Sequence, residues 1–265
     1  MVPKQAPRPP RIGLALGGGA ARGFAHIGVL QVLEEQGIKP DLVVGTSAGS
    51  LVAALYAAGK TPTELQSMAM TLDESSITDW VFPGRALLKG EALARFIRTQ
   101  TGGKQIENMR LPLGIVAADL QSGSSILFRR GDPGVAVRAS SAVPAVFEPV
   151  SINGREYIDG GAVSPIPVRY ARQMGAEVVI AVDISAIPQG QPTKRAVDIL
   201  LQTFNIMGHA ISQHELAEAD VVMRPKLEGI GSADFSSRRL SILAGREAAL
   251  MVLPQLKERI AARTR

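Results

Sequence analysis

The chain contains no cysteine among its 265 residues. Disulfide bonds, thiolate metal sites and cysteine nucleophiles are therefore excluded. Aromatic residues make up only 4% of the sequence, so the core must be built mostly from aliphatic side chains. No apolar run reaches the ~18 residues that a membrane-spanning helix needs, and residues 1–11 lack the apolar segment of a secretory signal. We therefore expect a cytoplasmic protein.

Charged residues are also sparse, at 20%, and the net charge is +5. This excess allows weak attraction to anionic surfaces, so we expect weak, salt-sensitive peripheral contact with lipid at the inner membrane face. Many of the cations lie at the two chain ends, which is typical of solvated tails, and no nucleic-acid partner is expected. With no evident linker, we expect a flexible tail over residues 1–10 and one domain over 11–265. The sequence does not determine the oligomeric state.

Apolar segments alternate with helical patterns from the start of the chain. A short strand over residues 11–16 precedes a glycine-rich turn and a helix over 25–36, and a second strand over 41–45 precedes a helix over 50–58. Such alternation predicts a mostly parallel sheet covered by helices. Further strands are expected over 113–119, 124–128, 150–152, 157–159, 178–184 and 221–223, and further helices over 61–72, 91–99, 165–174, 196–218 and 240–262.

The first site motif is Gly45-Thr46-Ser47-Ala48-Gly49, between an expected strand and an expected helix. A Gly-X-Ser-X-Gly sequence in this position is typical of a nucleophile elbow, in which a strained turn exposes the serine hydroxyl. Gly45 and Gly49 remove Cβ atoms where the strand and helix are closest. The motif therefore predicts Ser47 as a nucleophile; the alternative is a glycine-rich turn with a helix-capping serine.

The second site motif is the glycine-rich loop over residues 17–23, which also joins a strand to a helix. Successive unshielded backbone N–H groups can bind an anion, either a nucleotide phosphate or the oxyanion of an acyl-transfer intermediate. The spacing Gly17, Gly19, Gly23 is not that of a dinucleotide fingerprint, and the second strand lacks a ribose-binding acidic residue at its end. An oxyanion hole is therefore favoured, and a Rossmann-type nucleotide-binding protein remains the alternative.

The third motif is Asp159-Gly160-Gly161, an aspartate at the end of an expected strand. Together the three motifs resemble the patatin-like phospholipase family, particularly its short bacterial members. The resemblance spans residues 12 to 250. Its most specific segments are Leu16-Gly17-Gly18-Gly19-Ala20-Ala21-Arg22-Gly23-Phe24-Ala25-His26, Gly45-Thr46-Ser47-Ala48-Gly49, Ala139-Ser140-Ser141-Ala142-Val143-Pro144 and Asp159-Gly160-Gly161.

The resemblance implies a three-layer α/β/α sandwich with a mostly parallel central sheet, related to the α/β-hydrolases. It implies that a Ser47–Asp159 dyad cleaves acyl esters of phospholipids or lysophospholipids through an acyl-enzyme, with no metal and no cofactor. Two positions depart from the family pattern: Ala20 replaces a frequent third glycine, and Ser164 replaces a frequent asparagine. The resemblance places the oxyanion hole at Gly18, Gly19, Ala20, Arg22 and Gly23.

Two alternatives and one loop remain open at this point. The order Ser47, Asp159, then His209 or His214 would also suit a Ser-Asp-His α/β-hydrolase esterase, although Ser47 follows fewer strands than that fold requires. A member that kept the fold without catalysis is the other alternative. The apolar segment Trp80-Val81-Phe82-Pro83 could contact a lipid surface or flank the cleft, and ordinary burial is slightly preferred for it.

Overall fold

A computed structural model describes residues 8–79, 86–189, 193–231 and 233–264. The described strands form one sheet in the order β5-β6-β3-β2-β1-β7-β8, with β4 paired to β3. The neighbours β3, β2, β1, β7 and β8 run parallel, and β4, β5 and β6 join through antiparallel pairs. The strands are β1 (Ile12–Leu16), β2 (Leu42–Thr46), β3 (Leu113–Asp119), β4 (Ser125–Phe128), β5 (Val150–Ile152), β6 (Arg155–Asp159), β7 (Val178–Val182) and β8 (Val221–Met223).

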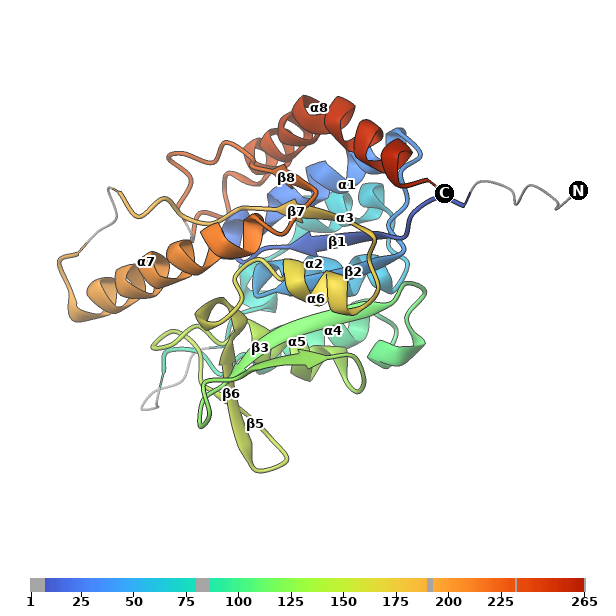
Figure 1. Ribbon diagram of the computed structural model, residues 1–265. Coiled ribbons are helices and arrows are strands. Elements are labelled where there is room, and N and C mark those ends of the chain that lie inside the picture. The colour runs from blue at the N-terminus through green and yellow to red at the C-terminus, as the bar shows by residue number, and fades with distance from the viewer. Residues whose placement is uncertain (1–7, 80–85, 190–192, 232, 265) are drawn as a thin grey trace, which may run out of the picture.

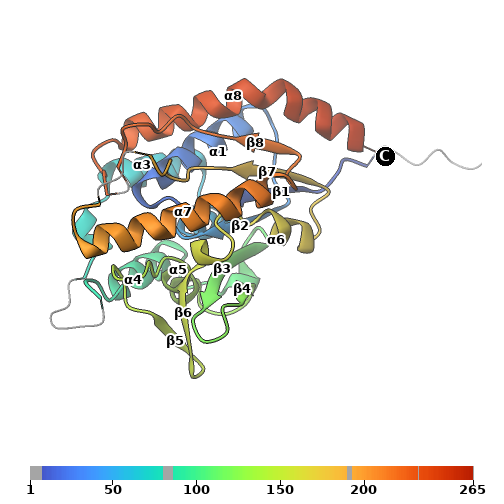
Figure 2. The ribbon, with the colours of Figure 1, turned by 60° about the vertical axis from the view of Figure 1, so that its left-hand side comes forward.

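The central strands are apolar on both faces because each face is covered by helices. In β1, Leu14 and Leu16 pack into one core while Ala15 packs into another on the opposite face. The larger core includes side chains of the helices α1, α2, α3, α4, α5 and α8, and the smaller includes side chains of α6 and the end of α7. The result is a helix–sheet–helix arrangement (Figures 1 and 2), which confirms the expected α/β/α class.

The helices that form these layers are mostly those that the sequence predicts. The α-helices are α1 (Ala25–Glu35), α2 (Ala48–Ala57), α3 (Pro62–Thr71), α4 (Glu91–Gln100), α5 (Pro133–Ser140), α6 (Val168–Gln173), α7 (Ala196–Leu216) and α8 (Arg238–Arg263). Short 3₁₀ turns are η1 (Ala20–Phe24), η2 (Glu74–Ser76), η3 (Ile106–Asn108) and η4 (Gly160–Ala162). None of the helices in the described ranges is long and apolar enough to cross a membrane.

Helix α5 is the main element that the sequence analysis missed. Its start, Asp132-Pro133-Gly134, has the composition of a turn, but Asp132 is an N-cap whose side chain accepts a hydrogen bond from the N–H of Gly134 at 2.7 Å. Pro133 occupies the first helical turn, where its missing N–H costs nothing. The helix ends at Ser140, and this end contacts the nucleophile elbow.

Strand β3 brings two distant segments together along one edge. Val116 pairs with Thr46 of β2, and the next residue, Ala117, pairs with Asp159 of β6. Both residues also pair with β4, so β2 and β6 share the opposite edge of β3 and end beside each other. The register therefore places the residue after Thr46 next to Asp159.

Candidate active site

Ser47 lies between β2 and α2 in a backbone conformation that few side chains adopt. Its φ is 53° and its ψ is −125°, and a left-handed φ is uncommon for residues other than glycine. The first turn of α2 fixes this conformation, because the N–H of Ser50 donates to the Ser47 carbonyl oxygen at 2.8 Å and the Ser50 hydroxyl does so at 2.6 Å. The geometry is that of a nucleophile elbow, and such strain is typical of functional sites.

The elbow requires both of its glycines. A Cβ added at Gly49 would lie 2.1 Å from the carbonyl oxygen of Leu16, and one added at Gly45 would lie 2.4 Å from the carbonyl oxygen of Gly49. Helix α2 therefore packs with its backbone directly against β1 and β2. Its positive N-terminal end points toward the site and favours negative charge that develops there.

The Ser47 hydroxyl donates a hydrogen bond to the Asp159 carboxylate, with 2.6 Å between Oγ and Oδ2. Ser47 is 8% exposed and Asp159 only 2%. The other carboxylate oxygen of Asp159 accepts the N–H of Gly161 at 2.7 Å. Burial raises the pKa of Asp159 to about 6, and the hydrogen bonds from Ser47 and Gly161 oppose this shift. The carboxylate is therefore a stronger base than a solvated aspartate.

The two glycines after Asp159 make room for close packing. A Cβ at Gly160 would lie 2.3 Å from the carbonyl oxygen of Val116, and one at Gly161 would lie 2.9 Å from Oδ1 of Asp159 itself. Gly161 also faces the ring of Phe204 on α7, at 3.3 Å from the position of an added Cβ. Helix α7 thus lies against the turn that carries the buried carboxylate.

Ser140 supports the elbow from the end of α5, a role that the sequence analysis missed. Its hydroxyl oxygen accepts the backbone N–H of Ser47 at 2.8 Å, and its proton is donated to the carbonyl oxygen of Val116 at 2.5 Å. The sequence contained a sign of this contact, because Ser140 belongs to one of the segments that resemble the family. The segment contains no motif with a known chemical role, so the sequence did not predict that Ser140 binds the Ser47 N–H.

The glycine-rich loop contacts the nucleophile at Gly18. A Cβ added there would lie 3.2 Å from Cβ of Ser47, a tight contact that shows how closely the loop passes the nucleophile. The N–H of Gly18 donates to the carbonyl oxygen of Pro165 at 3.0 Å. The expectation that this N–H serves as an oxyanion donor is therefore not supported by the hydrogen-bond pattern.

The next two residues of the loop have free N–H groups. Among the described residues, neither Gly19 nor Ala20 donates its backbone N–H to a protein acceptor. Ala20 has a φ of 52°, a left-handed conformation that strains alanine and would suit glycine. The loop thus presents two adjacent unpaired donors, one of them held in a strained residue.

Arg22 and Gly23 fix the shape of this loop. Arg22 is 6% exposed, and its Nε donates to the carbonyl oxygen of Gly19 at 3.2 Å. Burial lowers the pKa of Arg22, and the nearby charge of Asp183 opposes the shift. A Cβ at Gly23 would lie 2.9 Å from Cβ of Ala48, so Gly23 allows the loop to pack on the first residue of α2.

None of the three histidines contacts the catalytic pair. In the described residues, the Asp159 carboxylate accepts hydrogen bonds from Ser47 and Gly161 and from no histidine. His26 is fully buried, its Nε2 donates to the carbonyl oxygen of Gly17 at 2.8 Å, and burial lowers its pKa to about 4. It is therefore a neutral side chain that supports the glycine loop. His209 and His214 lie on α7, half-buried and exposed respectively.

A second buried carboxylate, Glu215 near the end of α7, fixes the segment after the Asp159 turn. It binds the hydroxyl of Ser164 and accepts the N–H of Ile166 at 2.8 Å. The Ser164 carbonyl oxygen accepts the hydroxyl of Thr46, the residue before the nucleophile, at 2.8 Å. Burial raises the pKa of Glu215 to about 7. The serine at position 164, where the family often has asparagine, is thus a partner of this carboxylate.

The segment Trp80-Val81-Phe82-Pro83 lies outside the described residues. A surface hollow of about 420 Å³ lined by polar residues lies beside α1 and α3, and none of its residues contacts Ser47 or Asp159. Among the described residues of this hollow, no hydroxyl group is hydrogen-bonded to a carboxylate, as Ser47 is to Asp159. We therefore place the active site at Ser47 and Asp159. The residues that line it are Gln31, Glu34, Glu35, Thr63, Gln66 and Arg246.

A strained serine after a parallel strand, hydrogen-bonded to a buried carboxylate and contacted by a glycine loop, defines the class of α/β serine hydrolases. The family is shown by comparison with known proteins. A family model described as patatin-like phospholipase matches residues 14–172, well over half of the chain. The chain belongs to the patatin-like phospholipase family.

Relatives in two kingdoms support this assignment. The chain is 34% identical over 206 residues to an uncharacterized NTE family protein of Mycobacterium tuberculosis, which covers 77% of this chain and 57% of that protein. It is 37% identical over 183 residues to patatin-like phospholipase domain-containing protein 6 of Homo sapiens, which covers 66% of this chain and 13% of that protein. The chain thus spans 57% and 13% of the length of these two relatives.

Solved structures show the same fold at low sequence identity. VipD from Legionella pneumophila aligns with a TM-score of 0.68 and 15% identity, covering 94% of this chain and 67% of that chain. ExoU, crystallised with SpcU from the type III secretion system of Pseudomonas aeruginosa, aligns with a TM-score of 0.56 and 15% identity, covering 96% and 53%. Membership of this family argues against the alternative of a Rossmann-type nucleotide-binding protein.

Proposed function

We propose that this chain hydrolyses acyl esters of lipids, as a phospholipase A or lysophospholipase, through a Ser47–Asp159 dyad. The observation that carries the proposal is the 2.6 Å hydrogen bond from the Ser47 hydroxyl to a buried carboxylate. An isolated hydroxyl is a weak nucleophile and needs an adjacent base. Membership of the patatin-like phospholipase family supports a lipid ester as the substrate.

The first half-reaction follows from this geometry. Oγ of Ser47 attacks the ester carbonyl carbon while its proton passes to Oδ2 of Asp159. The tetrahedral intermediate carries a negative oxygen, for which we propose the N–H groups of Gly19 and Ala20 as donors, aided by the N-terminal end of α2. When the intermediate collapses, the bond to the alcohol breaks, and Asp159 returns the proton to the leaving oxygen. The acyl group stays on Ser47.

The second half-reaction repeats these steps with water. Asp159 takes a proton from a water molecule that attacks the acyl-enzyme carbonyl, and the same donors stabilise the second oxyanion. Collapse releases the fatty acid, and Oγ recovers its proton from Asp159. The backbone turn at Ser47 and the hydrogen bond from its N–H to Ser140 position Oγ through both steps. Gly18, Arg22 and Gly23 shape the loop, and Gly45, Gly49, Gly160 and Gly161 permit the close packing.

The proposal is tested with an acyl-ester panel and a covalent probe. The panel contains a p-nitrophenyl ester, a lysophospholipid and a diacyl phospholipid, and the probe is a fluorophosphonate. We expect hydrolysis of at least one lipid ester by the parent chain, and labelling at Ser47 detected by peptide mass spectrometry. Ser47→Ala should lose both activity and labelling while its circular dichroism is unchanged. Retained hydrolysis by Ser47→Ala, or labelling at another serine, would exclude this mechanism.

A further inference from the structure

Helix α7 projects past the carboxyl edge of the sheet, where the catalytic pair lies (Figure 1). Its C-terminal end is buried through Ser212, Glu215 and Leu216. From Ile199 to Ile211 the described structure contains no fully buried residue. The C-terminal end of the helix is therefore fixed in the core, and residues 199–211 lie on the body with one side half-buried and the other exposed.

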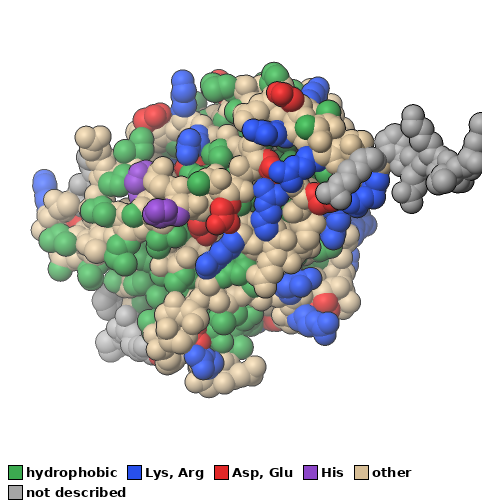
Figure 3. Space-filling model, in the orientation of Figure 1, with side chains coloured by type: hydrophobic (Ala, Val, Ile, Leu, Met, Phe, Trp, Pro, Cys, Tyr) green, Lys and Arg blue, Asp and Glu red, His purple; other side chains and the backbone are tan. Residues whose placement is uncertain are grey.

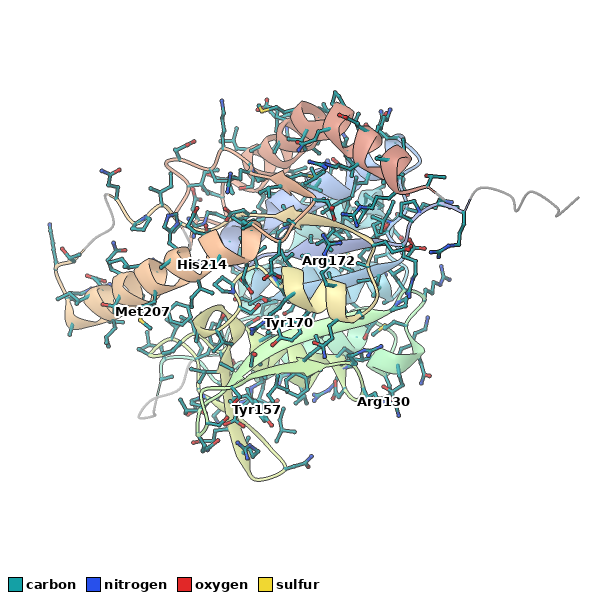
Figure 4. The ribbon with its side chains drawn as sticks, viewed as in Figure 1. Arg130, Tyr157, Tyr170, Arg172, Met207 and His214 are labelled. Carbon is teal, nitrogen blue, oxygen red and sulfur yellow. The ribbon has the colours of Figure 1, made fainter. Side chains whose placement is uncertain are left out.

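The projecting part of α7 exposes an apolar face. Ile199, Leu200, Ile206 and Met207 are 52%, 61%, 51% and 57% exposed. The spacing of seven residues between the two pairs places them on one side of the helix. Figure 3 shows hydrophobic side chains over this side of the molecule, and Figure 4 places Met207 on the projecting part and His214 nearer the fixed end. Exposed apolar patches of this kind indicate an interaction site.

The charge pattern indicates what this face contacts. Residues 199–214 contain no Asp, Glu, Lys or Arg. Just before them Arg195 forms an ion pair with Asp198 at 2.7 Å, and the cation Lys194 precedes this pair. An uncharged apolar face with a cation, Lys194, at its edge suits insertion between lipid headgroups. Helix α8 also exposes apolar side chains, such as Met251, but Glu247, Arg224 and Lys226 lie around them.

The position of α7 connects this face with the chemistry. Phe204, on the inner side of the helix, faces Gly161 of the Asp159 turn, and Gly208 approaches the carbonyl oxygen of Gly161 with 3.6 Å to an added Cβ. Ser47 itself is only 8% exposed. The ester group of a substrate must therefore leave bulk water and come close to the turn that holds Ser47. A lipid surface bound by the outer side of α7 would therefore lie close to the turn that carries Asp159.

We propose that the Ile199–Met207 face of α7 docks the enzyme on a lipid surface and so brings the Ser47–Asp159 pair close to the bilayer. This inference rests on the proposed function, because it takes the substrate to be a membrane lipid. Docking depends mainly on insertion of apolar side chains, and Lys194 together with the net charge of +5 adds a weaker, salt-sensitive attraction.

The test uses the full chain carrying Ser47→Ala, so that the vesicles are not hydrolysed and the result does not depend on catalysis. Flotation with vesicles of phosphatidylcholine and phosphatidylglycerol in equal parts measures partitioning. The double substitution Leu200→Asp and Met207→Asp should lower partitioning by about tenfold or more, because two apolar side chains that would leave water on docking are replaced by charged ones. The matched double substitution on α8, Leu250→Asp and Met251→Asp, should leave it near the parent value.

Binding at high salt concentration distinguishes insertion of apolar side chains from attraction between charges alone. We expect binding to remain at about 1 M salt, where the Debye length is about 3 Å. The proposal is overturned if the parent does not bind, if high salt abolishes binding, or if both double variants lose binding equally. It is also overturned if ultracentrifugation shows a dimer that the α7 variant dissociates, because the face would then bind a second copy. An inactive ester panel with normal flotation would reject the proposed function and leave docking intact.

Discussion

At the scale of single residues, the site depends on how far Asp159 is removed from water. The carboxylate is 2% exposed and receives two hydrogen bonds, from Ser47 and Gly161. Burial disfavours the charged form more than these donors favour it, and so the pKa rises to about 6. A base with this pKa is ionised at neutral pH and still has useful affinity for the serine proton.

The pH profile of the reaction should show this carboxyl group. Because only ionised Asp159 can accept the Ser47 proton, kcat/KM on a soluble ester should rise as pH increases through about 6 and then level off. The measurement is kcat/KM against pH for the parent chain, with enzyme stability checked at each value. A profile that falls over this range would contradict the assigned role of Asp159.

Ala20 gives a prediction about strain. Its φ of 52° costs alanine about 1–2 kcal/mol, whereas glycine adopts this conformation freely but loses about 0.5–1 kcal/mol of backbone entropy on folding. Ala20→Gly should therefore raise the free energy of unfolding by about 0.5–1 kcal/mol in urea denaturation. Ala21→Gly is the control, because Ala21 is 3% exposed and has no positive φ, and it should be destabilising. An Ala20→Gly variant that is less stable than the parent chain would contradict the inference that the Ala20 backbone is strained.

At the scale of elements, strand β3 assembles the site by pairing with two segments that lie far apart in sequence. The sequence predicts that a strand ends just before Ser47 and that another ends at Asp159. It does not predict that both strands pair with one edge of β3, because strand pairing is a long-range contact that no local pattern encodes. The Ser47–Asp159 pairing could be inferred in advance only from the resemblance to a family.

Helix α5 shows the limit of local patterns more clearly. The glycine and proline residues of Gly131-Asp132-Pro133-Gly134 are typical of a turn. In the structure a helix begins here, because the Asp132 side chain caps its first N–H groups. Ser140 at the end of that helix holds the Ser47 N–H. A residue whose role is to position another residue has no motif of its own, so it appears only when the fold is known.

Ser140→Ala should weaken both the fold and the elbow. It removes the acceptor of the Ser47 N–H and one donor to the Val116 carbonyl, and a buried group left unsatisfied costs about 1–3 kcal/mol. We expect a loss of stability of this size in urea denaturation and a lower kcat. Ser141→Ala is the matched control, because no described side-chain hydrogen bond involves Ser141. Equal stability of the two variants would argue against this support.

At the scale of the whole molecule, two buried carboxyl groups connect the fold to pH. Asp159 and Glu215 have pKa values raised to about 6 and about 7 from ordinary values of 3.8 and 4.5. The folded state therefore favours their protonated forms. The stability they contribute is complete below the unfolded pKa and is lost as pH rises through the folded pKa.

Glu215→Gln isolates one of these contributions. Between about pH 5 and about 7.5, the parent should lose about 2 kcal/mol of unfolding free energy relative to this variant, since one pKa unit corresponds to about 1.4 kcal/mol. Urea denaturation at both pH values measures the difference. A parent and variant with the same pH dependence would show that Glu215 is ionised equally in both states.

The central claim is a dyad in which Asp159, and no histidine, receives the Ser47 proton. The most direct test is kcat/KM on one soluble p-nitrophenyl ester for Asp159→Asn and for a variant with His209→Gln and His214→Gln together, each checked for folding by circular dichroism. The dyad predicts a loss of about 10²–10⁴ for Asp159→Asn and a value near the parent for the histidine variant. A histidine variant as inactive as Ser47→Ala would contradict the dyad and indicate a triad, whose members act as a unit.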